Sequence, residues 1–480
     1  RCAIKQSKEG CLEVMDNKAT ANTEERIEFN VLASARHPQP LDAYDPLAHR
    51  YAPEYVQPES WRLQIEVGTE PLPKNVAAYE WQVEQVEGAF RHEVRHEKQV
   101  ARIKNISVDV PEEGAYVVRL KATLENGREL VFERKICLRD FLIVAIGDSY
   151  FCGEGNPDEP AEPSPVVGPI ACNLATFTKV LVEKASFNIP MKREAKWQEK
   201  RAHRSYQSGP SLAAARLEQP ALGIVITFLN YARSGATVDE GLLGPRASDD
   251  DWTDEGEIAE LRQAIGDREI DALLISIGGN DIEFPDRLID LIRDDLILVG
   301  AGGGLGDDAL NRKQELAEAK KRLKELPDKL DKLAQEVAEL DARQTYLMQY
   351  PTGHFETVNE QGEIVVESGC GIFDGPDMNI DGKDARVIKK SGVRLNKTLR
   401  RTAQKHGWIL VEGIAEAFAG HGLCSPEPYF IAADESCRTQ GDFEGTMHPN
   451  AKGHEAYGEC IQKALSKFTI APVLDMDFAQ

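Results

Sequence analysis

Five short and almost uninterrupted apolar runs in the second part of the sequence constrain the fold most. They read FLIVAIG (141–147), LGIVITFLNY (222–231), ALLISIG (272–278), TYLMQY (345–350) and WILVEGI (408–414). Strands that are buried on both faces of a parallel sheet give such runs, because neither face has to be polar. Each run is followed by a loop and a helical or mixed segment, so residues 141–468 are predicted to form a three-layer α/β/α domain.

The sequence before Asp140 has a different pattern. Segments such as SWRLQIEVG, ISVDV and AYVVRLKATL alternate apolar and polar residues, and turn signals such as PEEG and ENG separate them. Alternation with a period of two is typical of strands with one buried face, so residues 25–140 are predicted to form an antiparallel β-sandwich. The late strands of this region resemble an immunoglobulin-like domain of the PKD type. Residues 1–24 lack periodicity and are expected to be a tail or linker, and residues 469–480 a C-terminal tail.

Residues 308–342 are predicted to be a helical insertion, because leucine, alanine and valine recur in them every seven residues. Pro327 interrupts this stripe, since proline removes a helical hydrogen bond and clashes with the preceding turn. We expect two helices or one kinked helix covering the sheet, in preference to a coiled coil that binds a partner.

The preceding segment, 299–306, has Leu305 where GxGxxG needs a third glycine, and is expected to be a flexible loop, with a lid as one role.

The charge of the chain argues against several classes of partner. Asp and Glu number 80 and Lys and Arg number 57, which gives a net charge of -23. Such a field repels nucleic-acid phosphates and gains nothing from an anionic membrane surface. No apolar run approaches the roughly 20 residues that a membrane-spanning helix needs. We therefore expect no nucleic-acid partner and no transmembrane segment.

The nine cysteines contain no CxxC pair, which argues against a thiolate zinc site. Disulfides in an exported protein are expected, with Cys424 and Cys437 forming one bridge across a short polar loop. Reduced thiols in a cytosolic protein are the alternative.

The sequence starts with Arg1 rather than methionine, and removal of a secretory signal would explain this. We therefore expect a secreted protein, extracellular or periplasmic.

Residues with useful chemistry follow the apolar runs. Ser149 follows the first run, Gly235 the second and Asn280 the third, while His448 lies in GTMHPNAKGH near the C-terminus. Ligands of open parallel sheets bind beyond the carboxyl ends of the strands, so these residues are expected to converge. His448 would remove the proton of Ser149, and the N–H groups of Ser149 and Gly235 with the Asn280 amide would form an oxyanion hole. For Ser149 alone, a turn serine that caps a helix is the alternative.

Four short motifs carry a resemblance to a known family. GDSY (147–150), SGA (234–236), GGND (278–281) and HPN (448–450) resemble blocks I, II, III and V of the SGNH (GDSL) hydrolases, in the same order. The segments HRSYQSGPSLAAA, MQYP and FAGHGLCS further resemble the actinobacterial type of these lipases and esterases. The resemblance implies a flavodoxin-like fold and ester hydrolysis through a serine acyl-enzyme, with no metal or organic cofactor.

The group that orients His448 is left open by the sequence. Family members commonly place an Asp three residues before the catalytic His, and Gly445 stands there in this chain. Asp442 is our first expectation for the orienting acid, ahead of Glu444, and a backbone carbonyl group is the alternative, as in the Ser-His dyads of some relatives. Cys152 is a rival nucleophile, but nothing near it in sequence would lower the pKa of its thiol.

Two segments match short metal-binding motifs. HEVRH (92–96) matches HExxH, but the alternation around it predicts a strand, where the helical spacing of the two histidines is lost. DMNIDGKD (377–384) aligns Asp377, Asn379 and Asp381 with the first ligands of a calcium loop, yet Ile388 stands where that loop needs a Glu. We expect no metal at the first segment and keep the second as a calcium candidate, with an Asx-rich turn as the alternative.

The sequence as a whole predicts a serine ester hydrolase, an esterase or lipase with Ser149 as nucleophile and His448 as general base. A carbohydrate O-acetylesterase and a non-catalytic binding protein on a hydrolase scaffold are the alternatives. The expected substrate is a small-molecule, lipid or polysaccharide ester. Neither the acyl chain length nor the oligomeric state follows from the sequence.

Overall fold

The computed structural model describes most of the chain. The described residues are 27–38, 43–67, 76–97, 105–164, 172–173, 176–177, 189–246, 255–283, 308–366, 372 and 382–467. The two expected tails, the segment 299–306 and the calcium candidates Asp377, Asn379 and Asp381 lie outside these residues.

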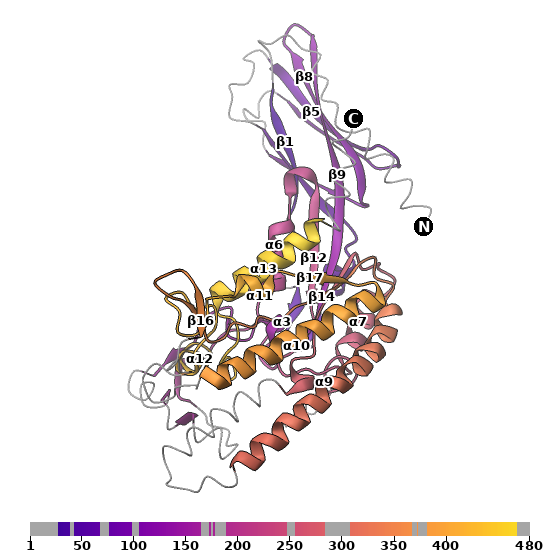
Figure 1. Cartoon of the computed structure of the whole chain (residues 1–480). Helices are drawn as coiled ribbons and strands as arrows, with labels where there is room; N and C mark the ends of the chain where they lie inside the picture. The colour runs from indigo at the N-terminus through magenta and orange to yellow at the C-terminus, as the bar shows by residue number, and fades with distance from the viewer. Residues whose placement is uncertain are drawn as a thin grey trace.

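One long strand, β9 (Glu129–Gly147), runs through both parts of the molecule (Figure 1). Its first half pairs antiparallel with β8 (Gly114–Leu124). Its second half lies parallel to β12 (Ile224–Asn230) and β13 (Ala272–Ser276). Burial along β9 is partial up to Arg139 and complete from Asp140 onward. The change of sequence pattern at Asp140 is therefore a change of surroundings within one strand.

The N-terminal part consists of two antiparallel sheets. One has the order β1 (Phe29–Ala33), β4 (Trp61–Val67), β7 (Ile106–Val110), and the other has the order β6 (Arg91–Glu97), β5 (Val76–Gln85), β8, β9. The two sheets share an apolar core that includes Leu63, Trp81 and Val118. The alternating segments are therefore strands, as predicted, and the HEVRH segment lies in one of them.

The second part is a parallel sheet covered by helices on both faces. The strand order is β12, β9, β13, β14 (Thr345–Met348), β17 (Ile409–Val411). Helix α6 (Gly209–Leu217) packs against α13 (Ala451–Leu465), and α9 (Asp308–Ala338) packs against α10 (Gly382–His406). The first pair lies on one side of the strands, and the second lies with α7 (Glu257–Ile265) on the other (Figure 1). The predicted three-layer α/β/α fold is confirmed.

The other described elements are short. They are β2 (Tyr44–Asp45), β3 (Arg50–Tyr51), α2 (Pro53–Val56), α3 (Ser149–Cys152), β10 (Glu162–Pro163), β11 (Met191–Arg193), η1 (Pro220–Leu222), η2 (Asn280–Ile282), β15 (Glu356–Val358), β16 (Ile364–Val366), α11 (Ile414–Ala417) and α12 (Ala433–Gln440).

The predicted helical insertion is one long helix, α9, which contains Pro327. Leu326, Leu330 and Leu333 are fully buried in the core that the helices form with the parallel sheet. The leucine spacing therefore places this helix on the sheet, as we expected in preference to a coiled coil that binds a partner. It is a single helix rather than two. None of the helices in the described ranges combines the length and the apolar character that crossing a bilayer requires.

A buried carboxylate joins the two parts where β9 passes between them. Asp140 accepts hydrogen bonds from the indole of Trp61 and the hydroxyl of Thr227, both at 2.9 Å. Arg36 and Arg268 each form an ion pair of 3.2 Å with the same carboxylate. Because a buried charge is costly unless it is paired and hydrogen-bonded, this network ties the N-terminal strands to the parallel sheet at one place.

The prediction of a disulfide between Cys424 and Cys437 is wrong. Cys437 of α12 is bonded to Cys172, which lies 265 residues earlier in the sequence. Cys437 is buried in an apolar cluster together with Cys172, and spacing along the chain does not reveal that contact. Cys137 takes part in another disulfide, and Cys424 in a further one.

Candidate active site

Ser149 lies directly after β9, at the start of the short helix α3. Gly147 has φ +142°, and a Cβ there would lie 2.0 Å from the backbone oxygen of Ser276, so only glycine fits. Asp148 caps α3 by accepting a hydrogen bond from the Tyr150 N–H at 3.2 Å. The serine is thus presented at the carboxyl end of the central strand, as the position of the GDSY motif predicts.

His448 reaches Ser149 from the other end of the sequence. The distance between His448 Nε2 and Ser149 Oγ is 2.7 Å across a separation of 299 residues. The backbone around the histidine is fixed by two hydrogen bonds of 2.9 Å with Ile431. The Ile431 oxygen accepts one from the Met447 N–H, and the Ile431 N–H donates the other to the His448 oxygen. Burial lowers the pKa of His448 from its ordinary value of 6.5, so the imidazole is neutral at pH 7 and can accept a proton.

Asn280 lines the same pocket as Ser149 and contacts the loop that contains Gly235. Gly235 has φ +76°, and the guanidinium group of Arg246 packs where a Cβ would be, 2.6 Å from that position. The side-chain amide of Asn280 donates a hydrogen bond of 2.9 Å to the oxygen of Ala236, which joins the two loops. An amide NH₂ group has two hydrogens, so this bond leaves one hydrogen of Asn280 for another acceptor.

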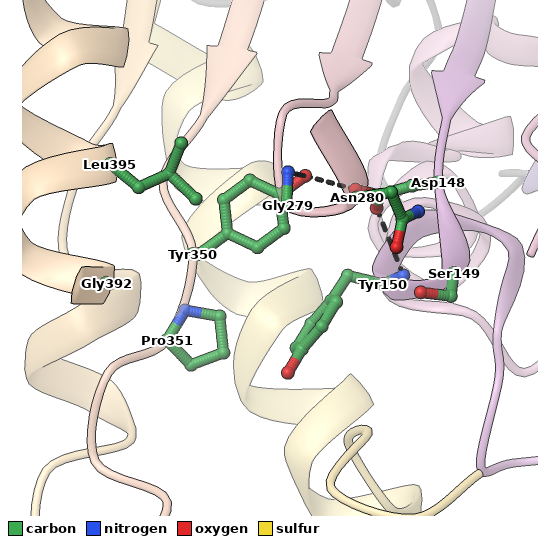
Figure 2. Close-up of a pocket in the computed structure, with 9 residues that line it drawn as sticks. All are labelled: Asp148, Ser149, Tyr150, Gly279, Asn280, Tyr350, Pro351, Gly392 and Leu395. Carbon is green, nitrogen blue, oxygen red and sulfur yellow. Dashed lines mark hydrogen bonds between the residues drawn. The ribbon is translucent and has the colours of Figure 1, made fainter. Parts of the chain in front are cut away.

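A pocket opens next to Ser149 (Figure 2). Its empty volume, including the part open to solvent, is about 350 Å³. Its lining residues are Asp148, Ser149, Tyr150, Gly279, Asn280, Tyr350, Pro351, Gly392 and Leu395. Figure 2 shows Ser149, Asp148 and Asn280 at one end, and Pro351 with Gly392 and Leu395 of α10 at the other. The end of the pocket that lies beyond the rings of Tyr150 and Tyr350, away from Ser149, is therefore suited to an apolar group.

Two buried polar groups next to the nucleophile were missed by the sequence analysis. Asp148 accepts a hydrogen bond from the hydroxyl of Tyr350 as well as from the Tyr150 N–H. Burial raises the pKa of Asp148 to about 7, although these hydrogen bonds oppose the shift. The Tyr150 hydroxyl donates to the Met447 oxygen at 3.1 Å and lies 3.0 Å from His354 Nε2. Tyr150 therefore links the nucleophile segment to the residue before His448.

The structure does not bring Asp442 to His448. The Asp442 carboxylate accepts hydrogen bonds from the Gln440 amide at 2.5 Å and from the Glu444 N–H at 2.9 Å, and lies 3.7 Å from His203 Nε2. Glu444 also faces His203, at 3.6 Å. Because Asp442 bonds to the backbone of its own turn, its side chain is directed away from His448.

The Nδ1 atom of His448 makes no hydrogen bond with any part of the chain that the structure describes. The backbone carbonyl groups of residues 444–446 surround the ring, and each raises the pKa of His448 and so favours its charged form. Among the alternatives left open by the sequence, the geometry thus favours a Ser-His pair with backbone oxygens near the ring.

Glu154, His203 and Asp442 form the one group of described residues whose oxygen and nitrogen atoms could together hold a metal ion. These atoms all lie within 4.8 Å of one another. However, His203 Nδ1 already bonds to the Glu154 carboxylate at 2.8 Å, and Gln440 donates to both Glu154 and Asp442. The carboxylates are thus satisfied by a cation and an amide of the chain itself, and we interpret the group as an ion-pair network.

Comparison with known proteins identifies a family. The model of the GDSL-like Lipase/Acylhydrolase family matches residues 145–456. A search of curated proteins finds no match.

Several solved structures resemble the chain at low identity. The extracellular lipase from Streptomyces rimosus is 20% identical with a TM-score of 0.43, covering 68% of this chain and 99% of that one. Phospholipase A1 from Streptomyces albidoflavus is 17% identical with a TM-score of 0.41, again covering 68% and 99%. A family two carbohydrate esterase from Clostridium thermocellum is 10% identical with a TM-score of 0.29, covering 93% and 99%.

These structural likenesses are too distant to indicate a substrate. The family match is different, since it spans well over half of the sequence and includes Ser149, Gly235, Asn280 and His448. The chain therefore belongs to the GDSL-like lipase/acylhydrolase family and is a carboxylic ester hydrolase.

Proposed function

We propose that the protein hydrolyses carboxylic esters through an acyl-enzyme on Ser149. The observation that supports this most is the 2.7 Å contact between His448 Nε2 and Ser149 Oγ, with the imidazole held neutral by burial. As Oγ attacks the ester carbonyl carbon, Nε2 takes the hydroxyl proton, and His448 then returns this proton to the leaving alkoxide. Water repeats the sequence on the acyl-enzyme, releasing the acid and restoring Ser149.

The oxyanion formed in each step requires donors that are already in place. We assign this role to the backbone N–H groups of Ser149 and Gly235 and to the free hydrogen of the Asn280 amide. Gly235 suits the role because it has no side chain to block a close approach. Asn280 suits it because a neutral donor stabilises the anion without forming an ion pair with Ser149 or His448.

The test of this mechanism is hydrolysis of p-nitrophenyl esters by Ser149→Ala and His448→Ala. Removing either member of a serine hydrolase pair typically lowers kcat by roughly 10⁴-fold or more. We expect a loss of this size in both variants with an unchanged circular dichroism spectrum. Activity of Ser149→Ala close to that of the wild type would refute the assignment.

A carbohydrate O-acetylesterase is the second candidate, and the size of the pocket favours it. The cavity volume next to Ser149 is only about 20 Å³, little more than one water molecule needs, and this suits a short acyl group better than a long chain. Rates on acetyl to dodecanoyl esters decide between the candidates. A lipase gains about 0.8 kcal/mol for each methylene that it buries, whereas an acetylesterase loses activity as the chain grows.

We also propose that the protein is exported, because the Cys172–Cys437 disulfide persists only in an oxidising compartment. Fractionation of producing cells tests this proposal. The protein is expected in the medium or the periplasm, and its presence in the cytosol with reduced Cys172 would contradict it.

A further inference from the structure

Glu154 is a fully buried carboxylate five residues after the nucleophile. Its oxygens accept hydrogen bonds from His203 Nδ1 at 2.8 Å and from the Gln440 amide at 2.6 Å. The pKa of Glu154 is lowered to about 2, because although burial acts against ionisation, His203, His448 and the Ser234 hydroxyl together outweigh it. Glu154 therefore carries a full negative charge in the interior of the protein.

The backbone of Glu154 and Gly155 lies beside His448. Gly155, the next residue, is in contact with the histidine, since a Cβ built on Gly155 would lie 3.3 Å from the Cβ of His448. The backbone oxygen of Glu154 accepts a hydrogen bond of 3.2 Å from His454 Nε2, on the helix that follows His448. Gln440, which holds the Glu154 side chain, belongs to the segment that leads to His448.

We propose that Glu154 is a positioning residue that supplies, through space, the negative charge that an aspartate supplies in a Ser-His-Asp triad. The proposal rests on the ester hydrolysis proposed above, in which His448 becomes positively charged while it holds the proton of Ser149. A triad acid both orients the imidazole and stabilises the imidazolium. Here the backbone around His448 orients the ring, and the carboxylate of Glu154 stabilises its charge.

Glu154 carries its charge near the backbone that contacts His448, because Gln440, which donates to its carboxylate, also accepts a hydrogen bond from the Gly155 N–H at 3.2 Å. The other groups around the ring are Ser149, Tyr150, His354 and His454. Burial lowers the pKa of His354 to about 3 and that of His454 to about 4, so both are neutral at pH 7. The Glu154 carboxylate opposes the effect of burial and raises the pKa of His448.

His203 has a supporting part in this arrangement. Burial alone would lower the pKa of His203, but Glu154 raises it to about 10, so the imidazole is charged and keeps Glu154 ionised. Asp442 and Glu444 also face His203, at 3.7 and 3.6 Å. His203 further stacks on Trp197, with ring centroids 4.7 Å apart. Glu154 and His203 thus form an ion pair that supports the segment after the nucleophile.

The test is the pH profile of kcat/KM for Glu154→Gln, which removes the charge and keeps the shape. An opposite charge nearby typically shifts a pKa by 1–3 units, so the acid limb of the profile is expected to move down by roughly one unit. The direction follows because losing the carboxylate destabilises the imidazolium. The plateau value of kcat/KM is expected to fall by up to about tenfold, since a shift of one unit in the pKa of His448 corresponds to a factor of ten. Glu154→Asp keeps the charge and should keep the acid limb near that of the wild type.

Glu218→Gln is the matched control. Glu218 is a half-buried carboxylate that accepts backbone hydrogen bonds from Arg36, His37 and Ile226, near the start of β12 and away from Ser149. Its replacement should lower stability without moving the acid limb. An acid limb of Glu154→Gln that coincides with that of the wild type would overturn the proposal, whatever the change in rate.

If Glu154→Gln does not fold, the double variant Glu154→Gln/His203→Gln replaces the ion pair by two neutral amides and so leaves no uncompensated buried charge. We expect the same downward shift in the acid limb of its kcat/KM profile. An acid limb that stays at the wild-type position would again overturn the proposal. Inactivity of the wild type, or full activity of Ser149→Ala, would instead refute the proposed hydrolysis. An increase in activity on adding Zn²⁺, lost in His203→Gln, would show that the group binds a metal and would also overturn the proposal.

Discussion

Replacing Tyr150 by phenylalanine tests how the catalytic histidine is held in place. The change removes one hydroxyl, which donates to the Met447 oxygen at 3.1 Å and lies 3.0 Å from His354 Nε2. Met447 has φ +68°, a backbone conformation that non-glycine residues rarely adopt without support. The ring of Tyr150 would remain against His448, with centroids 5.0 Å apart, so packing changes little.

The size of the effect follows from the groups left unpaired. Two hydrogen bonds are lost, and the buried Met447 oxygen loses this donor, so the free energy of unfolding should fall by about 2–4 kcal/mol. Release of the backbone at Met447 lets His448 shift, and a displacement near 1 Å can cost about 100-fold in rate, so kcat should fall roughly 10- to 100-fold. Urea titration measures the first quantity, and kcat at saturating substrate measures the second.

Tyr116→Phe provides the matched control in the N-terminal part. The Tyr116 hydroxyl donates to the Glu112 oxygen at 2.6 Å, so the same atom is removed far from Ser149. This variant should lose about 1 kcal/mol of stability and keep the wild-type kcat. If Tyr150→Phe is destabilised but retains the wild-type kcat, the hydroxyl stabilises the fold without positioning His448, and our reasoning is refuted.

Three further results are expected. Because burial lowers the pKa of His448, the acid limb of the wild-type kcat/KM profile should lie below pH 6.5, and a limb above that value would contradict a neutral buried base. Replacing Cys172 and Cys437 together by alanine should lower the free energy of unfolding by about 2–5 kcal/mol in a denaturant titration, whereas equal stability would show that the disulfide contributes nothing. Gly392→Val should narrow the pocket, since a Cβ there already meets Thr352 at 3.0 Å. The ratio of octanoyl to acetyl ester kcat/KM should then fall by about tenfold or more, as two excluded methylenes are worth about 1.6 kcal/mol, and an unchanged ratio would place the acyl group elsewhere.

The parallel sheet could be predicted because its strands are buried on both faces. Every residue of β12 and β13 is buried, which is why their sequences are continuously apolar. The same reasoning divides β9 at Asp140 and so misplaces its start, because a strand that passes from one-sided to two-sided burial changes its sequence pattern without ending.

The contact between Ser149 and His448 could be expected from the sequence because each residue follows a recognisable motif at a predictable edge of the sheet. The partners of Asp442 could not, since a turn of a few residues decides where its side chain points. Glu154 and His203 lie 49 residues apart, and no spacing rule connects two such residues in a loop. Their role depends on burial, which only the folded chain reveals.

Labelling with a fluorophosphonate probe tests the central claim most directly, because the probe reacts with a serine only when a base activates it. We expect one phosphonylated peptide, with the label on Ser149, and no label in His448→Ala. A label on Cys152, or none at all in the folded wild-type protein, would contradict the account.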